Sequence, residues 1–420
     1  MIGKRFFKKS VTGLVILFLL GLTTDCFAAK KPEKINIGVP IDLSGPYSTI
    51  LANYHLGYKD VVNWINDNGG VKGVPLNLVV MDTGAKVPRA ISAFDQIMRS
   101  DPRPVAFVHQ HSTEQEALKK RYIEEKMANH SNSGAYGVLS PPSTQFSNMA
   151  AGYAPAFARF MKWWKDNEWP KKGIQRNPRM AMITWDIAFG KAPLTKESLA
   201  YLKDELKIDY VGSSYIPFFP TDTTSQLLSA RAAGADIIMG WYHVGAFSVL
   251  LKDAMRLGLK DKIDFGNVIT GTEYILPRLA GRQAAEGVYA VTIHPFWDEM
   301  DIPGVVLLNK IFKDNNRDPE KDKLFGYTTA LNIFLTIKQV CEVVVDEYGW
   351  EGLNSENYLK VLNSGRSFDV MGTTPPVKYV GNTRVLSHMK VGRIVNGQLI
   401  GVSDWLKCPN LWPKEWGWEF

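Results

Sequence analysis

The sequence predicts an α/β fold with two lobes, each built on a parallel β-sheet. Apolar strands alternate with amphipathic helices at the rhythm of βαβ units. The same pattern begins afresh around residues 146–155, which indicates a second lobe. The chain of 420 residues also exceeds the roughly 100–200 residues typical of one domain, so two lobes are expected from length alone.

The first lobe opens with a strand over residues 35–41, because its alternate residues are apolar and share one face. A polar turn at residues 43–46 leads into a helix that carries Tyr54 and Ile65. Further strands are expected at 76–81, at 105–108 and around Met127, and further helices at 88–100 and 114–126. Open α/β sheets bind small molecules at the carboxyl ends of their strands, so the polar strand exits are candidate ligand loops.

The second lobe repeats this order of elements. We expect helices at 156–169, 191–206, 224–233, 244–257 and 272–279, and strands at 180–185, 210–216, 236–239 and 263–269. Residues 287–293 look like the route back to the first lobe, which then gains helices at 303–315 and 324–348. Asn396 and Gly397 between two alternating runs predict a hairpin. The Trp-rich tail at 403–420 has too little pattern for a domain.

The amino terminus is typical of an export signal. Lys4 and Arg5 precede an apolar run at residues 11–22, which is shorter than the roughly 20 residues that span a bilayer. Cys26-Phe27-Ala28 offers a small-x-Ala site, so we expect residues 1–28 to be a signal peptide and the protein to be periplasmic. Lipoprotein anchoring at Cys26 is the alternative, although Asp25 in front of it fits a lipoprotein signal poorly.

Charge and cysteine content narrow the function classes. The formal charge of +7 loses four basic residues and one acid with the signal, which leaves a mild excess without a basic block. No nucleic-acid partner is therefore expected. Only Cys341 and Cys408 remain after export, and two cysteines in an oxidising compartment can pair. We hypothesise a disulfide between them that links the tail to the long helix.

Three short motifs in order carry a resemblance to a known family. They are residues 34–57 (KINIGVPIDLSGPYSTILANYHLG) continued by 65–76, residues 236–242, and Ala284-Ala285-Glu286-Gly287-Val288. Over nearly all of 34–402 the chain resembles the periplasmic solute-binding proteins of branched-chain amino acid ABC transporters, the leucine-binding-like family. The resemblance implies the type I periplasmic binding fold, in which two Rossmann-like parallel-sheet lobes are joined by a three-segment hinge.

The resemblance also implies where the chain passes between the lobes. Its crossings fall near residues 148–154, 291–297 and 372–384. Lobe one would then comprise residues 34–150 plus 294–374. Lobe two would comprise residues 151–293 plus 375–402, followed by the tail at 403–420.

In this family, hydroxyl and backbone N–H groups at two strand exits of lobe one hold the ligand carboxylate. The matching positions here are His111, Ser112 and Thr113, then Ser131, Asn132 and Ser133. The physical chemistry agrees, because N–H groups at a helix start bind anions without a formal charge. The sequence departs from the family by placing histidine where a small hydroxyl residue is usual.

From lobe two the family contributes aromatic side chains and an acid for the ammonium of an amino acid. Phe189 matches the first aromatic, Trp241 or Tyr242 the second, and Glu273 lies one or two residues from the position of the acid. A buried ammonium without an anionic or π partner is costly, so absence of such a partner would argue against α-amino acids. The aromatic residues favour an aromatic or branched organic acid, with an amino acid as the other choice.

The expected function is capture of a small carboxylate-bearing solute by a non-catalytic, monomeric protein that needs no cofactor and serves an inner-membrane ABC permease. A ligand sensor of the same fold that feeds a signalling partner is one alternative. A zinc enzyme built on His109, His111 and His130 with Glu114 is another. Alternate histidines on a strand are ordinary, however, and the sequence has no His-Glu-x-x-His or Gly-x-Ser-x-Gly motif.

Overall fold

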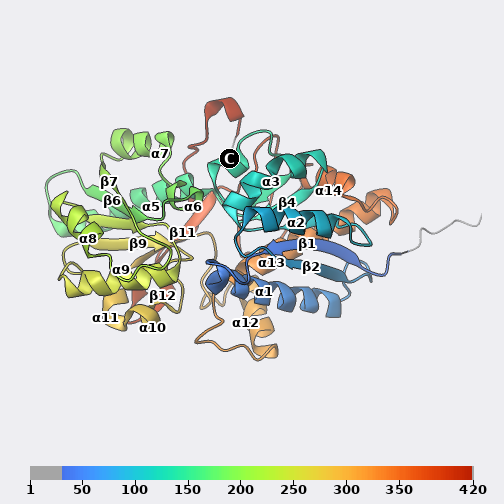
Figure 1. Ribbon diagram of the computed structural model, residues 1–420, viewed down its shortest axis with the longest axis horizontal. Helices are drawn as coiled ribbons and strands as arrows, with labels where there is room; N and C mark the ends of the chain where they lie inside the picture. Colours follow the sequence, from blue (N-terminus) through green and yellow to red (C-terminus); the bar gives the residue numbers. More distant parts are fainter. Residues whose placement is uncertain (1–30, 419–420) are drawn as a thin grey trace, which may run out of the picture.

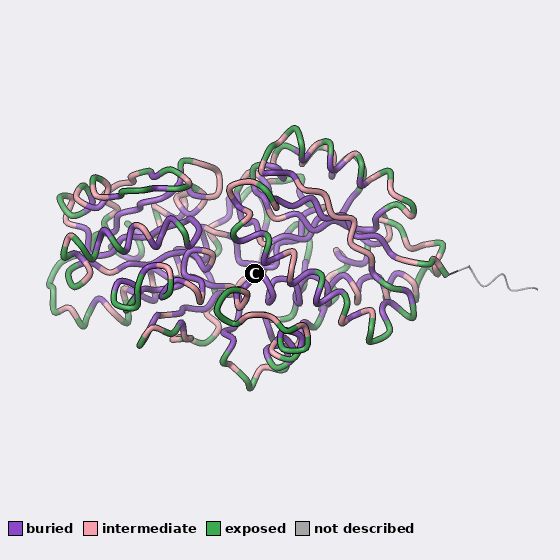
Figure 2. Tube along the Cα trace, turned by 60° about the horizontal axis from the view of Figure 1, so that its bottom comes forward, coloured by how far each residue is buried: buried purple, intermediate pink, exposed green. Residues whose placement is uncertain are grey.

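The computed structural model describes residues 31–418 as two α/β lobes that lie side by side (Figure 1). The expected signal peptide, with Cys26, lies outside the described residues. Buried segments fill the interior of each lobe and the junction between them, while the helices around the sheets expose their outer faces (Figure 2). The predicted α/β fold with two parallel-sheet lobes is confirmed.

Lobe one contains a sheet with the strand order β2-β1-β3-β4-β5, in which every pair is parallel. The strands are β1 (Ile35–Ile41), β2 (Leu76–Asp82), β3 (Ala106–Val108), β4 (Ala128–Ser131) and β5 (Phe146–Asn148). They are connected by α1 (Ser48–Asp67), α2 (Val87–Met98), α3 (Ser112–Glu124) and α4 (Tyr136–Leu139). All seven residues of β1 are buried, as expected for a parallel strand covered on both faces.

The chain returns to lobe one with α12 (Pro303–Asp314), α13 (Gly326–Tyr348) and α14 (Ser355–Leu362). Within residues 31–418, α13 is the one helix long and apolar enough to cross a membrane by length and composition. Because 72% of its most apolar window is buried inside the protein and the helix packs along α1, it is a core helix of lobe one.

Lobe two contains a larger sheet with the order β12-β11-β10-β9-β8-β6-β7. Its strands are β6 (Arg179–Thr184), β7 (Asp209–Tyr215), β8 (Ile237–Gly240), β9 (Asp264–Val268), β10 (Tyr289–Thr292), β11 (His388–Val395) and β12 (Gln398–Gly401). The stretch β7-β6-β8-β9-β10 is parallel and repeats the strand order of lobe one. Both sheets therefore direct the carboxyl ends of equivalent strands toward the junction (Figure 1).

The helices of lobe two differ in part from the sequence prediction. The structure contains α5 (Tyr153–Asn167), η1 (Trp169–Lys172), α6 (Ala188–Lys191), α7 (Lys196–Ala200), η2 (Tyr201–Glu205), α8 (Thr224–Ala232), α9 (Val244–Arg256), α10 (Leu276–Ala280) and α11 (Arg282–Ala285). The predicted helix 191–206 is broken because Pro193 lacks an N–H donor and Thr195 caps a new helix by accepting from the Ser198 N–H. The predicted helix 272–279 begins only at Leu276.

The predicted hairpin at residues 396–397 is confirmed. It joins β11 to β12, with Val395 opposite Gln398. Asn396 and Gly397 both have positive φ values, 53° and 73°, as a two-residue type I′ turn requires.

Three chain crossings join the lobes. The first lies between β5 and α5, and the second between β10 and α12. The third lies at residues 384–388, where the Asn148 N–H donates to the Arg384 carbonyl at 2.8 Å and the Leu386 N–H donates to the Ala150 carbonyl at 2.9 Å. We expected this crossing at 372–384. It lies later because Tyr379, whose hydroxyl donates to the Asn148 carbonyl at 3.1 Å, still packs on lobe one.

The carboxyl-terminal tail connects the two lobes a fourth time (Figure 1). β13 (Leu406–Lys407) pairs with β11 of lobe two, and η3 (Lys414–Trp416) follows. Trp412, Trp416 and Trp418 are buried together in a cluster with residues of lobe one that include Val138. Trp412 packs on the first crossing, where a Cβ at Gly152 would overlap its ring.

The hypothesised disulfide is wrong. Cys341 and Cys408 are both free and buried. Cys341 faces the core of lobe one from α13, whereas Cys408 packs in the cluster on the lobe-two sheet, so the two thiols belong to different cores. Burial raises the pKa of each thiol well above its ordinary value.

Candidate ligand-binding site

A cavity of about 90 Å³ lies between the two lobes, at the carboxyl ends of their strands. Its walls come from the exits of β1, β3 and β4 on one side, from those of β8, β9 and β10 on the other, and from the first crossing. The lining residues are Tyr47, Ile50, Leu51, Tyr54, Gln110, His111, Ser112, Thr113, Asn132, Ser133, Ala150, Gly152, Tyr153, Ala156, Phe189, Trp241, His243, Val268, Ile269, Thr270, Val291, Ile293 and His294.

The start of α3 forms the polar wall of lobe one. His111 is the N-cap, and its Nδ1 accepts from the Glu114 N–H at 3.4 Å. The Ser112 and Ser133 hydroxyls are hydrogen-bonded at 2.6 Å, which joins the exits of β3 and β4. The first N–H groups of a helix have no partner inside it and lie at the positive end of its dipole, so this wall attracts an anion.

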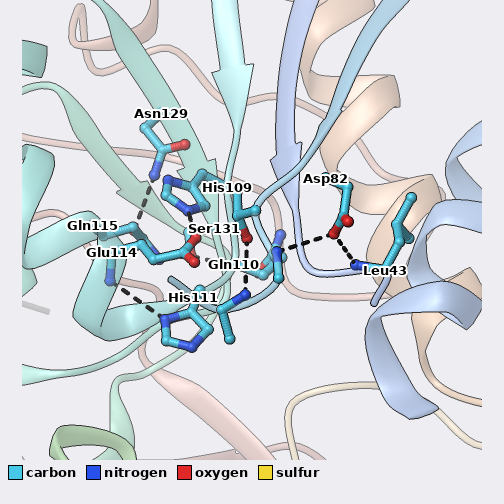
Figure 3. Close-up of polar contacts among 12 residues, drawn as sticks. Leu43, Asp82, His109, Gln110, His111, Glu114, Gln115, Asn129 and Ser131 are labelled. Carbon is cyan, nitrogen blue, oxygen red and sulfur yellow. Dashed lines mark hydrogen bonds and ion pairs between the residues drawn. The ribbon is translucent and has the colours of Figure 1, made fainter. Parts of the chain in front are cut away.

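A hydrogen-bond network fixes these exits against the rest of lobe one (Figure 3). The Gln110 amide accepts from the Asn132 N–H at 2.9 Å and donates to the Tyr58 hydroxyl at 3.0 Å. The Asn132 amide donates to the Thr329 hydroxyl of α13 at 2.8 Å, and His294 Nε2 lies 3.1 Å from that hydroxyl. The second crossing, which carries His294, is thereby held to the ligand wall.

Aromatic rings form the opposite wall and close the gap between the lobes. Tyr153 of α5 packs on Phe189 and Trp241, with ring centroids 5.4 and 5.5 Å apart. Tyr47 of lobe one reaches lobe two, where its ring lies 5.1 Å from His243 and 5.7 Å from Phe218. The lobes are therefore in direct contact around the cavity.

The cavity carries no formal charge at neutral pH. Its lining, which is drawn from residues 31–418, includes no Asp, Glu, Lys or Arg. Burial lowers the pKa of His111, and it lowers the pKa of His243 and His294 to about 3, because the charged imidazolium loses its hydration. All three imidazoles are consequently neutral, and recognition must rely on hydrogen bonds, dipoles and apolar contact.

Several polar atoms of the lining are buried without a hydrogen-bond partner. They are His111 Nε2, Asn132 Oδ1, Trp241 Nε1, His243 Nδ1, Thr270 Oγ1 and His294 Nδ1. An unsatisfied buried polar atom costs about 1–3 kcal/mol, so such atoms are uncommon in folded proteins. The six atoms of this lining are available to hydrogen-bond a polar ligand.

Most of the sequence-predicted site residues meet at this cavity. His111, Ser112, Thr113, Asn132, Ser133, Phe189 and Trp241 all line it. Ser131 does not: its hydroxyl accepts from the Ser133 N–H at 2.8 Å and from Gln115 at 3.2 Å, so it supports the wall from behind. Tyr242 does not either, because successive residues leave β8 on opposite sides and its ring packs on Phe247.

Glu273 also lies outside the lining. Its carboxyl group accepts from the Phe325 N–H at 3.3 Å, just before α13 begins. Burial raises the pKa of Glu273 to about 8, so the group is mainly protonated at pH 7. Glu273 therefore offers no anionic partner to an ammonium group in the cavity, contrary to the role that the resemblance implies.

The site residues predicted from the sequence did not include seven polar or aromatic residues of the lining, namely Tyr47, Tyr54, Gln110, Tyr153, His243, Thr270 and His294. Three of them, Gln110, His243 and Thr270, stand on the same strand exits as predicted positions. If the prediction had included the two residues on either side of each predicted position, it would have contained Gln110 and His243. Tyr47 follows the polar turn at 43–46, which was itself predicted as a ligand loop.

The zinc alternative finds no support in the arrangement of its histidines. His109 Nε2 pairs with Glu114 at 2.8 Å, and its Nδ1 lies 3.3 Å from the Tyr122 hydroxyl (Figure 3). His130 is instead bonded to Tyr358 at 2.6 Å. Between residues 31 and 418, no group of three or more His, Cys, Asp or Glu side chains is placed to hold a metal ion.

Comparison with known proteins gives consistent results. The model of a family described as periplasmic binding protein matches residues 34–398. A search of curated proteins found no match. Among solved structures, the chain is similar to a branched-chain amino acid ABC transporter protein from Thermus thermophilus with bound valine. The TM-score is 0.79 at 18% identity, covering 91% of this chain and 98% of that one.

Two further structures have different ligands in their descriptions. A fatty acid ABC transporter substrate-binding protein from Thermomonospora curvata aligns with a TM-score of 0.74 and 18% identity over 91% of this chain and 96% of that one. A solute-binding protein from Rhodopseudomonas palustris HaA2 in complex with p-hydroxybenzoic acid aligns with a TM-score of 0.72 and 15% identity, over 91% and 99%. At these identities the likeness shows a shared fold.

Proposed function

Because the chain belongs to the periplasmic binding protein family, of the leucine-binding-like type, we propose that it captures a small carboxylic acid between its lobes and delivers it to an ABC permease in the inner membrane. The family implies a solute-binding protein outside the cytoplasm. The identity of the solute class follows from the cavity, and one observation carries it: an anion-attracting helix start faces an uncharged aromatic wall.

The carboxylate end is assigned to lobe one. Ser112, Thr113 and Ser133 present hydroxyl groups beside the first N–H groups of α3, and the unpartnered Nε2 of His111 adds a further hydrogen-bonding atom. Hydrogen bonds to a charged acceptor contribute about 1.5–3 kcal/mol each, so two or three of them hold a carboxylate without a cationic side chain.

The body of the ligand is assigned to the apolar lining. Tyr54, Tyr153 and Phe189 enclose the cavity together with aliphatic side chains such as Leu51 and Val268. An engineered cavity of about 150 Å³ holds benzene. The cavity of about 90 Å³ therefore suits a compact branched acid, and an aromatic acid requires the lobes to separate slightly.

A thermal-shift screen of small carboxylic acids, followed by calorimetric titration, tests this function. We expect at least one branched or aromatic acid to raise the melting temperature and to bind with 1:1 stoichiometry. Ser133→Ala should weaken that binding about tenfold, or about 1.4 kcal/mol, because it removes a hydroxyl from the carboxylate wall.

Ser147→Ala is the matched control. Ser147 is equally buried, on the neighbouring strand β5, but its hydroxyl bonds to His130 Nδ1 at 2.8 Å behind the cavity. This variant should lose stability and keep its affinity for the acid. Unchanged binding by Ser133→Ala, or equal loss in both variants, would refute the assigned carboxylate wall.

A further inference from the structure

Three residues that line the lobe-two end of the cavity each carry a buried polar atom without a hydrogen-bond partner. The atoms are Nε1 of Trp241, Nδ1 of His243 and Oγ1 of Thr270. The exits of β8 and β9 that carry them are joined by the Val244 N–H, which donates to the Thr270 carbonyl at 2.9 Å. The Trp241 carbonyl accepts from the Thr184 hydroxyl at 3.0 Å, so the backbone of this exit is fixed while the side chains of Trp241, His243 and Thr270 line the cavity.

The surroundings of these atoms are uncharged. The His243 ring is enclosed by Tyr47, Trp185 and Phe189, with ring centroids 5.0–5.8 Å apart, and faces the neutral His111. Glu273, on the same loop as Thr270, is turned away to the Phe325 N–H. Glu114 is paired with His109 in lobe one. An ammonium group at this end would therefore lose its hydration without gaining an anionic partner, and cation–π contact with the surrounding rings, worth about 2 kcal/mol, would not offset that loss.

We propose that the lobe-two end of the cavity recognises a neutral hydrogen-bonding group of the ligand, a hydroxyl or a carbonyl, in the place where an amino acid would present its ammonium. This assignment rests on the proposed function. The ligand class is accordingly a hydroxy or oxo carboxylic acid with an apolar body.

The donor and acceptor properties of the three side chains support this class. An indole N–H only donates, so it requires an acceptor in the ligand. The Thr270 hydroxyl both donates and accepts, and a neutral imidazole does either according to its tautomer. A hydroxyl or carbonyl oxygen is an acceptor for which the Trp241 indole and the Thr270 hydroxyl are both suitable donors. An ammonium group has three donors and no acceptor, and it leaves the indole N–H unpaired.

Two matched series of acids test the proposal by calorimetric titration. The aliphatic probes are 2-hydroxy-4-methylpentanoate, leucine and 4-methylpentanoate. The aromatic probes are 4-hydroxybenzoate, 4-(aminomethyl)benzoate and benzoate. In at least one series we expect the hydroxy acid to bind about tenfold or more tightly than both the ammonium compound and the compound without a second polar group.

Two variants locate this preference. In Trp241→Phe and in Thr270→Val the advantage of the hydroxy acid over the unsubstituted acid, both measured on the same variant, should fall to about threefold or less. Thr272→Val is the control, because the Thr272 hydroxyl is buried against the Tyr289 carbonyl at 3.3 Å and does not line the cavity. It should keep the full preference.

The proposal is overturned if an ammonium compound binds as tightly as its hydroxy analogue, or if the hydroxy preference survives in both variants. It is also overturned if neither series binds. The screen of carboxylic acids tests the proposed function separately. Tight binding of an acid without a second polar group would support capture of a carboxylic acid and would contradict the preference for a hydroxy or oxo acid.

Discussion

At the scale of single residues, Glu273 shows most clearly how burial changes the role of a side chain. The resemblance implies an anion that pairs with an ammonium group. In the structure the carboxyl group is fully buried and bonded to the Phe325 N–H, and its second oxygen has no partner. Desolvation disfavours the ionised form, and it is the main reason that the pKa of Glu273 rises to about 8.

This raised pKa predicts a specific pH dependence of stability. The folded protein keeps a proton on Glu273 that the unfolded chain releases above about pH 4.5. The stability from this group is complete below pH 4.5 and is lost as the pH rises to about 8. Glu273→Gln removes this titration. The free energy of unfolding of the variant minus that of the wild type should therefore increase by about 1.4 kcal/mol for each pH unit as the pH rises from 5 to 8.

Urea unfolding at several pH values measures this difference. Glu205→Gln, which changes an exposed glutamate on η2, is the control and should follow the wild-type pH profile. Parallel profiles for wild type and Glu273→Gln would show that Glu273 does not hold a proton in the folded protein.

The sequence predicted the strand exits better than the direction of each side chain on them. His111, Ser133 and Trp241 line the cavity as expected because a strand exit and a helix start are both visible in the residue pattern. Ser131 and Tyr242 are next to lining residues and point elsewhere. Sequence alone does not fix this choice, since one residue of register reverses the side to which every neighbour points.

At the scale of elements, the turn between β1 and α1 is the most informative segment. It carries Tyr47, whose N–H donates to the Asp42 carboxylate at 2.9 Å while its ring crosses to lobe two. There the ring contacts His243, Phe218 and Trp185. Aromatic pairs contribute about 0.5–1.5 kcal/mol each beyond their buried area, so this turn stabilises the closed arrangement without a ligand.

We therefore expect Tyr47→Ala to open the lobes. Small-angle X-ray scattering of the ligand-free protein should show a larger radius of gyration for this variant than for wild type. Tyr348→Ala removes a tyrosine that is 43% exposed at the end of α13, far from the turn in sequence and structure, and serves as the control. An unchanged radius for Tyr47→Ala would mean that its ring does not hold the lobes together.

Helix boundaries were the weaker part of the prediction at this scale. The helix predicted over 191–206 has apolar residues at helical spacing after Pro193, and this spacing hides the break. The ring of Pro193 and the cap at Thr195 instead give two short helices followed by a π turn. Here Pro193 and the cap at Thr195, and not the apolar spacing, decide where the helix begins.

At the scale of the whole molecule, two copies of one strand order face each other across the cavity. Sequence predicted this duplication because strands and helices alternate regularly in both halves. It did not predict the tail, whose tryptophans have no period and bury themselves only against an assembled lobe one. The sequence also led to the hypothesis of a disulfide between Cys341 and Cys408, although the two thiols lie in separate cores. The reason is that spacing along the chain carries no information about which lobe a residue joins.

We propose that lobe one holds a carboxylate at the start of α3 while lobe two closes over the rest of the ligand. Calorimetric titration of the wild-type protein with the tightest-binding acid and with its primary amide separates this arrangement from recognition of shape alone. The amide, which has the same shape and no charge, should bind at least about tenfold more weakly. Equal affinity for the acid and the amide would rule out a carboxylate site at the start of α3.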